Sequence, residues 1–301
     1  MALATPERSA AQALARLSSG AGKSGRERAF EWLLLAATAV SLVVLAVLLW
    51  DILSNGTGRL SLDFLRSFTS RRAEQTGVRA GLTGSLSLML LTAAVAFPVG
   101  VGAAVYFEEH APRNRMTRLL EANIANLAGV PSVVYGLLGL AVFTYALQMG
   151  RSLIAGALTL ALLILPVIIV SGREAIRAVP RAIRDGGLAL GATPLQVTRR
   201  QVLPSALPGI MTGTILALSR AVGETAPLLV VGAVFSRRTD TMPWQVFEPF
   251  TALPIQVYDF LSRPQEAFQQ ASAAGSMVLI TVLLVMNSAA IVLRNRYARR
   301  W

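Results

Sequence analysis

Five long stretches of the sequence contain no charged residue, and this feature limits the fold more than any other. They are 19 to 29 residues long and cover 32–50, 80–107, 122–150, 152–172 and 267–293. A sixth stretch, 201–236, holds only the charges of Arg220 and Glu224. About 20 apolar residues span a bilayer as a helix, and in lipid a helix satisfies its own backbone hydrogen bonds. The sequence therefore predicts an all-α integral membrane protein with six transmembrane helices, near 31–51, 82–107, 124–147, 152–171, 207–234 and 271–293.

The composition agrees with a protein whose main solvent is lipid. Of the 301 residues, 54% are hydrophobic and 15% are charged, against roughly 25% charged in an ordinary soluble domain. The chain has no cysteine and one histidine, His110, so disulfides, thiolate ligands and multi-histidine metal sites are excluded. We expect no metal site. The net charge of +12 is compatible with nucleic-acid binding, but its distribution along the chain favours a membrane and no nucleic acid.

The basic residues predict the topology. With the N-terminus inside, the inside segments carry 18 lysines and arginines, and the outside loops carry nine. This bias places both termini in the cytoplasm, together with the loops 108–123 and 172–206. The first outside loop, 52–79, holds five arginines and is the weak point of this assignment. Residues 1–29 are polar, basic and rich in small residues, which predicts a disordered cytoplasmic tail.

One short segment of this tail resembles part of a nucleotide-binding motif. Gly20-Ala21-Gly22-Lys23-Ser24 looks like the end of a P-loop. The full motif needs a glycine five positions before Gly22, where Leu17 stands, and a strand before the loop with a helix after it. We therefore expect that this chain does not hydrolyse ATP by itself.

The cytoplasmic loop 172–206 contains the signals of a short helix. Gly191 can reverse the chain. Thr193 can then cap the helix, with Pro194 in its first turn and Gln196 completing a capping box. We expect Pro204 to end this helix. The residues alone leave two interpretations open. The helix either lies on lipid headgroups or docks a cytoplasmic partner.

A family resemblance separates these interpretations. The loop is similar to that of ABC importer permeases, with the pattern Glu-Ala-Ala, three residues, Gly, nine residues, Ile, one residue, Leu-Pro. Gly191, Leu203 and Pro204 match, whereas Asp185-Gly186-Gly187 replaces Glu-Ala-Ala and Gln201 replaces Ile. The resemblance implies a coupling helix at 191–200 in a cleft of an ATPase subunit. Its coupling residues would be Gly191, Ala192, Thr193, Pro194, Leu195 and Arg199.

Further segments resemble one branch of this family, the A-type permease subunits of bacterial phosphate-specific importers (PstA). They are 100–109, 126–136, 165–169, 189–193, 220–229 and 253–256. The resemblance implies the ABC type I importer permease (MetI-like) fold in the bacterial plasma (inner) membrane. After the tail, 30–76 would form the first transmembrane helix and an extracytoplasmic loop, and 77–301 the permease domain. The resemblance also implies three partners: a second homologous permease, an ATPase dimer that carries the ATP and Mg²⁺, and an extracytoplasmic phosphate-binding protein. It implies no cofactor on this chain.

The charged pair inside the fifth predicted span is the candidate substrate path. Arg220 and Glu224 are four residues apart, so one helix would place them on one face, beside a ridge of small residues at Gly209, Gly213, Ala217 and Ala221. In the functional interpretation, Arg220 attracts phosphate and Glu224 keeps the anion from being trapped. In the structural interpretation, the ion pair fixes helix register. The family often has an arginine at the position of Val170, for which Arg173 or Arg177 could substitute.

The sequence thus predicts a non-enzymatic permease subunit that moves inorganic phosphate inward. One alternative is a permease for another oxyanion, such as sulfate or molybdate. Another is a membrane scaffold that senses phosphate without transporting it. A membrane enzyme is disfavoured, because the spans hold no carboxylate cluster, histidine pair or nucleophile–base arrangement.

Overall fold

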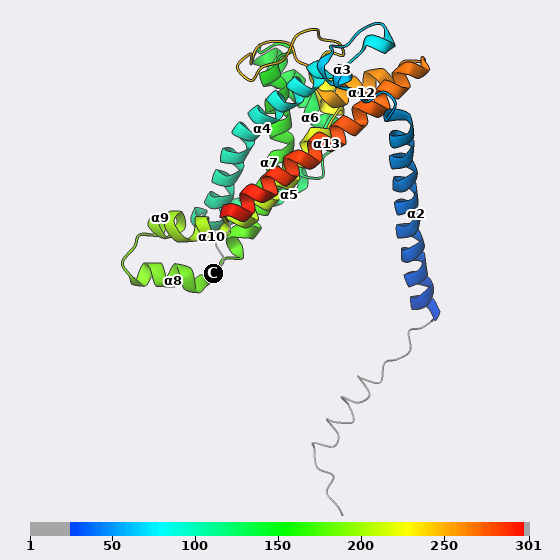
Figure 1. Ribbon diagram of the computed structural model, residues 1–301. Coiled ribbons are helices and arrows are strands. Elements are labelled where there is room, and N and C mark those ends of the chain that lie inside the picture. Colours follow the sequence, from blue (N-terminus) through cyan, green and yellow to red (C-terminus); the bar gives the residue numbers. More distant parts are fainter. Residues whose placement is uncertain (1–24, 298–301) are drawn as a thin grey trace, which may run out of the picture. The chain divides into compact units, whose positions relative to one another are not determined.

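The computed structural model describes residues 25–297 (Figure 1). The P-loop-like segment and most of the predicted tail lie outside this range. Every regular element between residues 25 and 297 is helical, as predicted. Chain contacts divide the protein into two units, Met1–Asp51 and Ile52–Trp301, which we describe separately.

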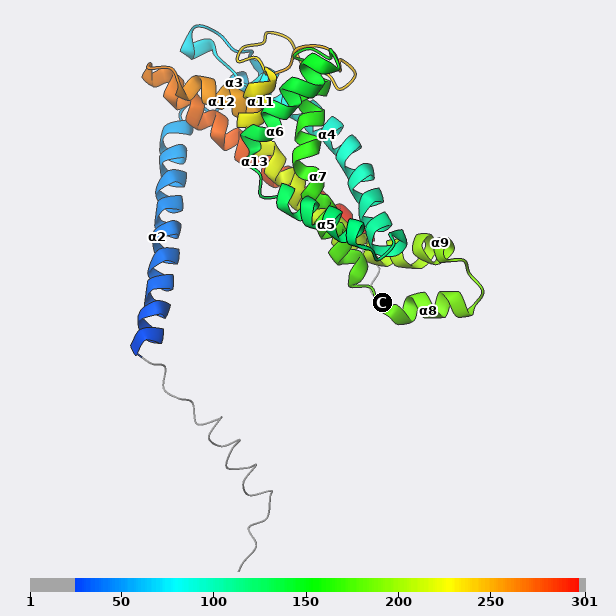
Figure 2. The same cartoon turned by 180° about the vertical axis from the view of Figure 1, so that it is seen from behind.

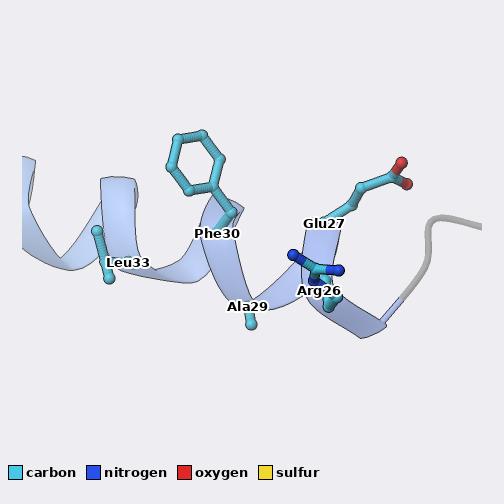
Figure 3. Close-up of a pocket in the computed structure, with 5 residues that line it drawn as sticks. All are labelled: Arg26, Glu27, Ala29, Phe30 and Leu33. Atoms are coloured by element: carbon cyan, nitrogen blue, oxygen red, sulfur yellow. The ribbon is translucent and has the colours of Figure 1, made fainter.

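The first unit contains most of α2 (Gly25–Gly56), which carries the first predicted span. Its N-terminal end changes from charged to apolar within about two turns. Figure 3 shows Arg26 and Glu27 at this end, followed along the same helix by Ala29, Phe30 and Leu33. Farther along α2, the hydroxyl of Thr38 donates a hydrogen bond to a backbone carbonyl one turn earlier. This bond satisfies the polar group within an otherwise apolar helix.

The second unit is built around α7 (Leu153–Arg177), its most buried long helix. Both α4 (Arg79–Val105) and α10 (Leu203–Gly223) pack along α7, and α13 (Glu266–Tyr297) packs on α10. The core between these helices is aliphatic, with Leu88, Leu160, Ile164, Ile168 and Ala217. The second, fourth and sixth predicted spans are thereby confirmed. A π-helical turn, η2 (Tyr106–His110), extends α4.

The third predicted span is not one helix. It consists of α5 (Arg115–Leu127) and α6 (Ser132–Gly139), bent by 105° at the break, and α6 continues into η3 (Leu140–Ala146). The prediction of a single helix over 124–147 was wrong because Pro131 disfavours helical geometry in the residue before it. The hydroxyl of Tyr135 donates a 2.8 Å hydrogen bond to the carbonyl of Leu127 across the bend. If this bent pair counts as one span, the described residues contain six.

The fifth predicted span also has different limits. It begins early, since α9 (Pro194–Val197), the π-helical η4 (Thr198–Val202) and α10 form one long helix. Pro204 does not end this helix, contrary to the prediction. Pro204 comes two residues after the end of η4, where the Leu203 N–H bonds to the Thr198 carbonyl five residues earlier. This π-helical register departs from the regular bonding to the residue four positions earlier, which Pro204 could not make. The span ends at Gly223, and α11 (Ala226–Val231) follows as a separate short helix.

The loops of the second unit gather at its two ends. Both views place α8 (Arg181–Ala189) and α9 side by side at one end (Figures 1 and 2). The opposite end holds α3 (Leu62–Arg66), η1 (Ala73–Gln75) and α12 (Leu253–Leu261). Segments predicted to lie on opposite sides of the membrane therefore occupy opposite ends of the unit.

One glycine controls how closely the short helices approach. A Cβ atom at Gly136 of α6 would lie 2.7 Å from the backbone Cα of Pro227 in α11. Because backbone cannot rotate away, we expect Gly136→Leu to lower the free energy of unfolding by about 1–3 kcal/mol, the usual cost of overpacking. Thermal unfolding of the purified chain in detergent measures this effect. Gly102→Leu is the matched control, since no atom lies within 4 Å of a Cβ there. Equal melting temperatures for both variants would contradict the proposed packing.

Candidate translocation site and coupling surface

Arg220 and Glu224 form the predicted ion pair, but the helix ends between them. The Nε atom of Arg220 lies 3.2 Å from Oε1 of Glu224. Glu224 has φ −72° and ψ 114°, which is extended backbone, and follows the last residue of α10. The helix ends at Gly223 because Pro227 has no N–H to donate to the Gly223 carbonyl and its ring would clash there. The ion pair therefore joins the last turn of α10 to the residue that follows the helix, and the two side chains do not lie along one continuous helical face.

The two faces of α10 have different surroundings. The predicted ridge packs on α7, and a Cβ at Gly209 would lie 2.7 Å from the Cβ of Ala175. Ala217 and Ala221 of the same ridge are buried. Arg220 lies on the neighbouring face, which is exposed in this chain and is formed by Thr212, Leu216, Arg220 and Gly223. We call these four residues the exposed α10 stripe. The side chain of Arg220 is 44% exposed and that of Glu224 is 16% exposed.

A second helix break lies near this pair. Because α6 packs on α11, the bend before α6 and the break before α11 belong to neighbouring elements. Tyr135 of α6 is buried, and its phenol lies within electrostatic range of Arg220. Tyr135 was not among the residues predicted for the site. Two features of the sequence could have indicated Tyr135. It belongs to segment 126–136, which resembles the permease family, and it lies four residues after Pro131.

The arginines of α7 do not lie level with Arg220, and their substitution for the family arginine at Val170 stays a prediction. Ser171 faces Gly213 and Ala175 faces Gly209, so α7 and α10 run antiparallel. In this register the position level with Arg220 is residue 164, and Arg173 lies nine residues away, or about 14 Å along the helix axis. The structure therefore does not bring Arg173 and Arg220 together.

Arg173 and Arg177 instead belong to an ion-pair network at the α8–α9 end. Arg173 lies 2.9 Å from Glu121 and 3.6 Å from Glu108, and Arg177 lies 3.0 Å from Glu108. The network joins η2, α5 and α7. His110, at the end of η2, is exposed. Between residues 25 and 297, no three His, Cys, Asp or Glu side chains gather as a metal site would require.

The predicted capping box is present in the coupling segment. The Thr193 hydroxyl accepts a 3.3 Å hydrogen bond from the backbone N–H of Gln196, and the Gln196 side chain accepts one of 2.9 Å from the Thr193 N–H. Gly191 has φ +81°, a left-handed conformation that favours glycine and reverses the chain before α9. Pro194 occupies the first turn. Local side-chain chemistry therefore fixes where this helix begins.

Of the two glycines that replace Ala-Ala, Gly187 has a packing role, whereas no atom lies within 4 Å of a Cβ at Gly186. A Cβ at Gly187 of α8 would lie 2.9 Å from Cγ2 of Val197 and 2.6 Å from Oε1 of Gln201. The close approach of α8 to α9 and η4 leaves three apolar side chains exposed at the tip, namely Leu188, Leu190 and Leu195. Of these, Leu190 is 88% exposed and Leu195 is 65% exposed. We call these three leucines the leucine tip.

Arg184 connects α8 to the helix bundle. Its guanidinium lies 2.7 Å from Glu109 of η2 and donates hydrogen bonds to the carbonyls of Val179 and Ile176 at the end of α7. Such charge-assisted bonds are among the stronger hydrogen bonds in proteins. A displacement of α8 is therefore transmitted to the ends of both α4 and α7.

Comparisons with known proteins agree with this architecture. Residues 96–300 match the family model described as the binding-protein-dependent transport system inner membrane component. The chain is 33% identical to the probable ABC transporter permease protein YqgI of Bacillus subtilis, over 84% of this chain and 89% of that protein. It is 34% identical to the phosphate transport system permease protein PstA 1 of Mycobacterium tuberculosis, over 87% of this chain and 86% of that protein.

A solved structure shows the same fold. It is a bacterial alginate ABC transporter in complex with an alginate-bound periplasmic protein, with a TM-score of 0.63 and 14% identity. The match covers 91% of this chain and 98% of the other. The predicted MetI-like fold and the multi-pass membrane character are thereby confirmed. The chain belongs to the inner membrane components of binding-protein-dependent transport systems, which are the permease subunits of ABC importers.

Proposed function

We propose that this permease moves inorganic phosphate inward across the bacterial plasma membrane, with both termini in the cytoplasm. It works with a second homologous permease, an ATPase dimer that carries ATP and Mg²⁺, and an extracytoplasmic phosphate-binding protein. The observation that carries the proposal is the position of Arg220, on an exposed stripe of a transmembrane helix and beside a helix break.

Glu224 compensates the charge of Arg220 only in part, since the arginine side chain is still 44% exposed. A guanidinium stays protonated in proteins, and a charged side chain that faces lipid is costly. The ridge residues pack on α7, so the exposed α10 stripe would otherwise face lipid. A second permease that covers this stripe, and leaves a hydrated path along it, removes the cost. The stripe repeats at spacings of three and four residues, which suits packing against another helix.

The same charge selects an oxyanion. The planar guanidinium presents paired N–H donors that match two oxygens of a phosphate group. Glu224 occupies part of this donor set at 3.2 Å, so an arriving anion competes with a carboxylate and can leave again. Phosphate as the specific cargo is supported by the likeness to PstA 1. The alginate transporter supports only the fold, because its identity is 14%.

The leucine tip supports the ATPase contact. A cluster of large exposed apolar side chains is typical of a protein interaction site. A movement of the ATPase dimer would reach the bundle through Arg184 and along the continuous helix of α9, η4 and α10. This assignment gives Gly191, Ala192, Thr193, Pro194, Leu195 and Arg199 a role in docking or in shaping the docked segment.

The opposite end offers a surface for the substrate-binding protein. The segment between α11 and α12 exposes two large aromatic side chains, Trp244 and Phe247. Exposed aromatic residues are enriched in protein interfaces. The solved alginate transporter contains a bound periplasmic protein, which supports this kind of partner.

Replacing Arg220 tests the path. In proteoliposomes that contain the assembled importer, we expect Arg220→Gln to lower the uptake of labelled phosphate about tenfold or more, equivalent to at least about 1.4 kcal/mol of lost anion attraction. Excess sulfate should not compete with phosphate in the wild-type importer. Arg66→Gln, at an exposed arginine of α3, is the control for charge. Unchanged uptake by Arg220→Gln in an assembled complex would leave Arg220 only a structural role.

Replacing Leu195 tests the coupling. We expect Leu195→Asp to abolish transport-stimulated ATP hydrolysis, because a carboxylate buried in an apolar contact has no compensating partner. Leu195→Met preserves an apolar side chain of similar volume and should retain most of the activity. ATP hydrolysis by the reconstituted importer, with and without the loaded binding protein, measures both. Normal stimulation in the aspartate variant would rule out docking through this residue.

A further inference from the structure

A polar hollow of about 630 Å³ lies at the end of the second unit that carries α8 and α9. Its walls come from η2, the loop before α5, the first turns of α5, the end of α7 and the start of α8. Five arginines and two glutamates line it, which gives a net charge of +3. The charged lining residues are Glu108, Glu121, Arg113, Arg118, Arg173, Arg177 and Arg181.

The two glutamates are already engaged. Glu121 lies 2.9 Å from Arg173, and Glu108 lies 3.0 Å from Arg177 and 3.6 Å from Arg173. Arg173 also stacks its guanidinium 5.8 Å from the ring centroid of Phe107. Even so, the buried Nε atom of Arg173 has no hydrogen-bond acceptor. The acidic groups of the hollow therefore neutralise its inner two arginines and leave at least one donor unused.

The outer three arginines have no such partner. Arg113, Arg118 and Arg181 are exposed, and within residues 25–297 none of them forms an ion pair. Asn114 is next to them and caps α5 through its side-chain oxygen, which accepts a 2.8 Å hydrogen bond from the Thr117 N–H. The N-terminal end of the 13-residue helix α5 thus opens at the hollow, and a helix N-terminus favours a negative charge.

We propose that this hollow is a binding site for a phosphate group, held by Arg113, Arg118 and Arg181. Its source is either inorganic phosphate or the headgroup of an anionic phospholipid, which share the same oxyanion chemistry. Inorganic phosphate with two negative charges would reduce the net charge of the lining from +3 to +1, and a phosphodiester headgroup with one would reduce it to +2. Each guanidinium can bind two of the phosphate oxygens. The site is separate from Arg220 and does not depend on which solute the permease carries.

Occupancy of the hollow would affect the ion-pair network. The bound anion would compete with Glu108 and Glu121 for Arg173 and Arg177, which hold η2, α5 and α7 together. The same region carries the contact between Arg184 and Glu109. An anion in the hollow would therefore alter the stiffness of the connection between α8 and the bundle.

A triple variant tests the site in the full-length chain. Equilibrium dialysis of the purified protein in neutral detergent with labelled inorganic phosphate tests the first source. Native mass spectrometry after exchange from phosphatidylglycerol nanodiscs tests the second. We expect Arg113→Gln/Arg118→Gln/Arg181→Gln to weaken one of these two interactions at least tenfold. Arg66→Gln/Arg71→Gln/Arg72→Gln removes the same charge from exposed positions at the other end and should behave like the wild type.

The controls separate binding from folding and from the membrane path. The Arg220 site is intact in all of these proteins, so any phosphate bound there contributes equally to each of them and does not affect the comparison. The lysine version, Arg113→Lys/Arg118→Lys/Arg181→Lys, keeps the charge and should keep binding with lower affinity. Melting temperatures without ligand verify that each variant is folded. The proposal is overturned if the Arg113/Arg118/Arg181 glutamine variant binds both phosphate and phosphatidylglycerol as tightly as the Arg66/Arg71/Arg72 control does.

Discussion

The permanent charge of Arg220 is the constraint on which the membrane part of this protein depends. The ridge of small residues lets α10 lie against α7, and this contact turns the exposed α10 stripe, with Arg220, away from the core of the unit. Pro227 ends the helix one turn later, so Glu224 can fold back onto the guanidinium. The chain thus presents a charged, half-neutralised edge, which a second permease would cover in the proposed function.

The two helix breaks follow from the same requirement. Lipid cannot satisfy free backbone groups, so irregular backbone at membrane depth is tolerated where protein or a water-filled cavity surrounds it. Here α6 packs on α11 through Gly136, and the Tyr135 hydroxyl satisfies the carbonyl of Leu127 at the bend. These contacts satisfy part of the irregular backbone, whereas Leu127, Gly129 and Pro131 at the bend are exposed in this chain. Broken helices with this arrangement form the substrate sites of many transporters.

Local chemistry made part of this structure predictable from the sequence. Charge-free length determined the second, fourth and sixth spans, and the capping box at Thr193 depended only on its own neighbours. The bend at Pro131 was missed because average hydropathy does not distinguish a continuous span from a bent pair. The partners of Arg173 and Arg177 could not be predicted, since Glu108 and Glu121 lie 50 to 70 residues away in the chain and meet them only through helix packing.

The incorrect prediction for Pro204 has a mechanistic consequence. If the helix ended at Pro204, the coupling segment would be connected to the bundle only by loops and by Arg184. Instead, one helix runs from Pro194 to Gly223, so that Pro194 and Arg220 are separated by 26 residues, or about 39 Å of helix. In the proposed function, a shift imposed on Leu195 would reach Arg220 along this helix, in which Pro204 and Pro208 each remove one backbone hydrogen-bond donor. The π-helical turn η4 and Pro208 interrupt the regular α-helical hydrogen bonding of this connection, so we expect any bend in its first half, away from Arg220.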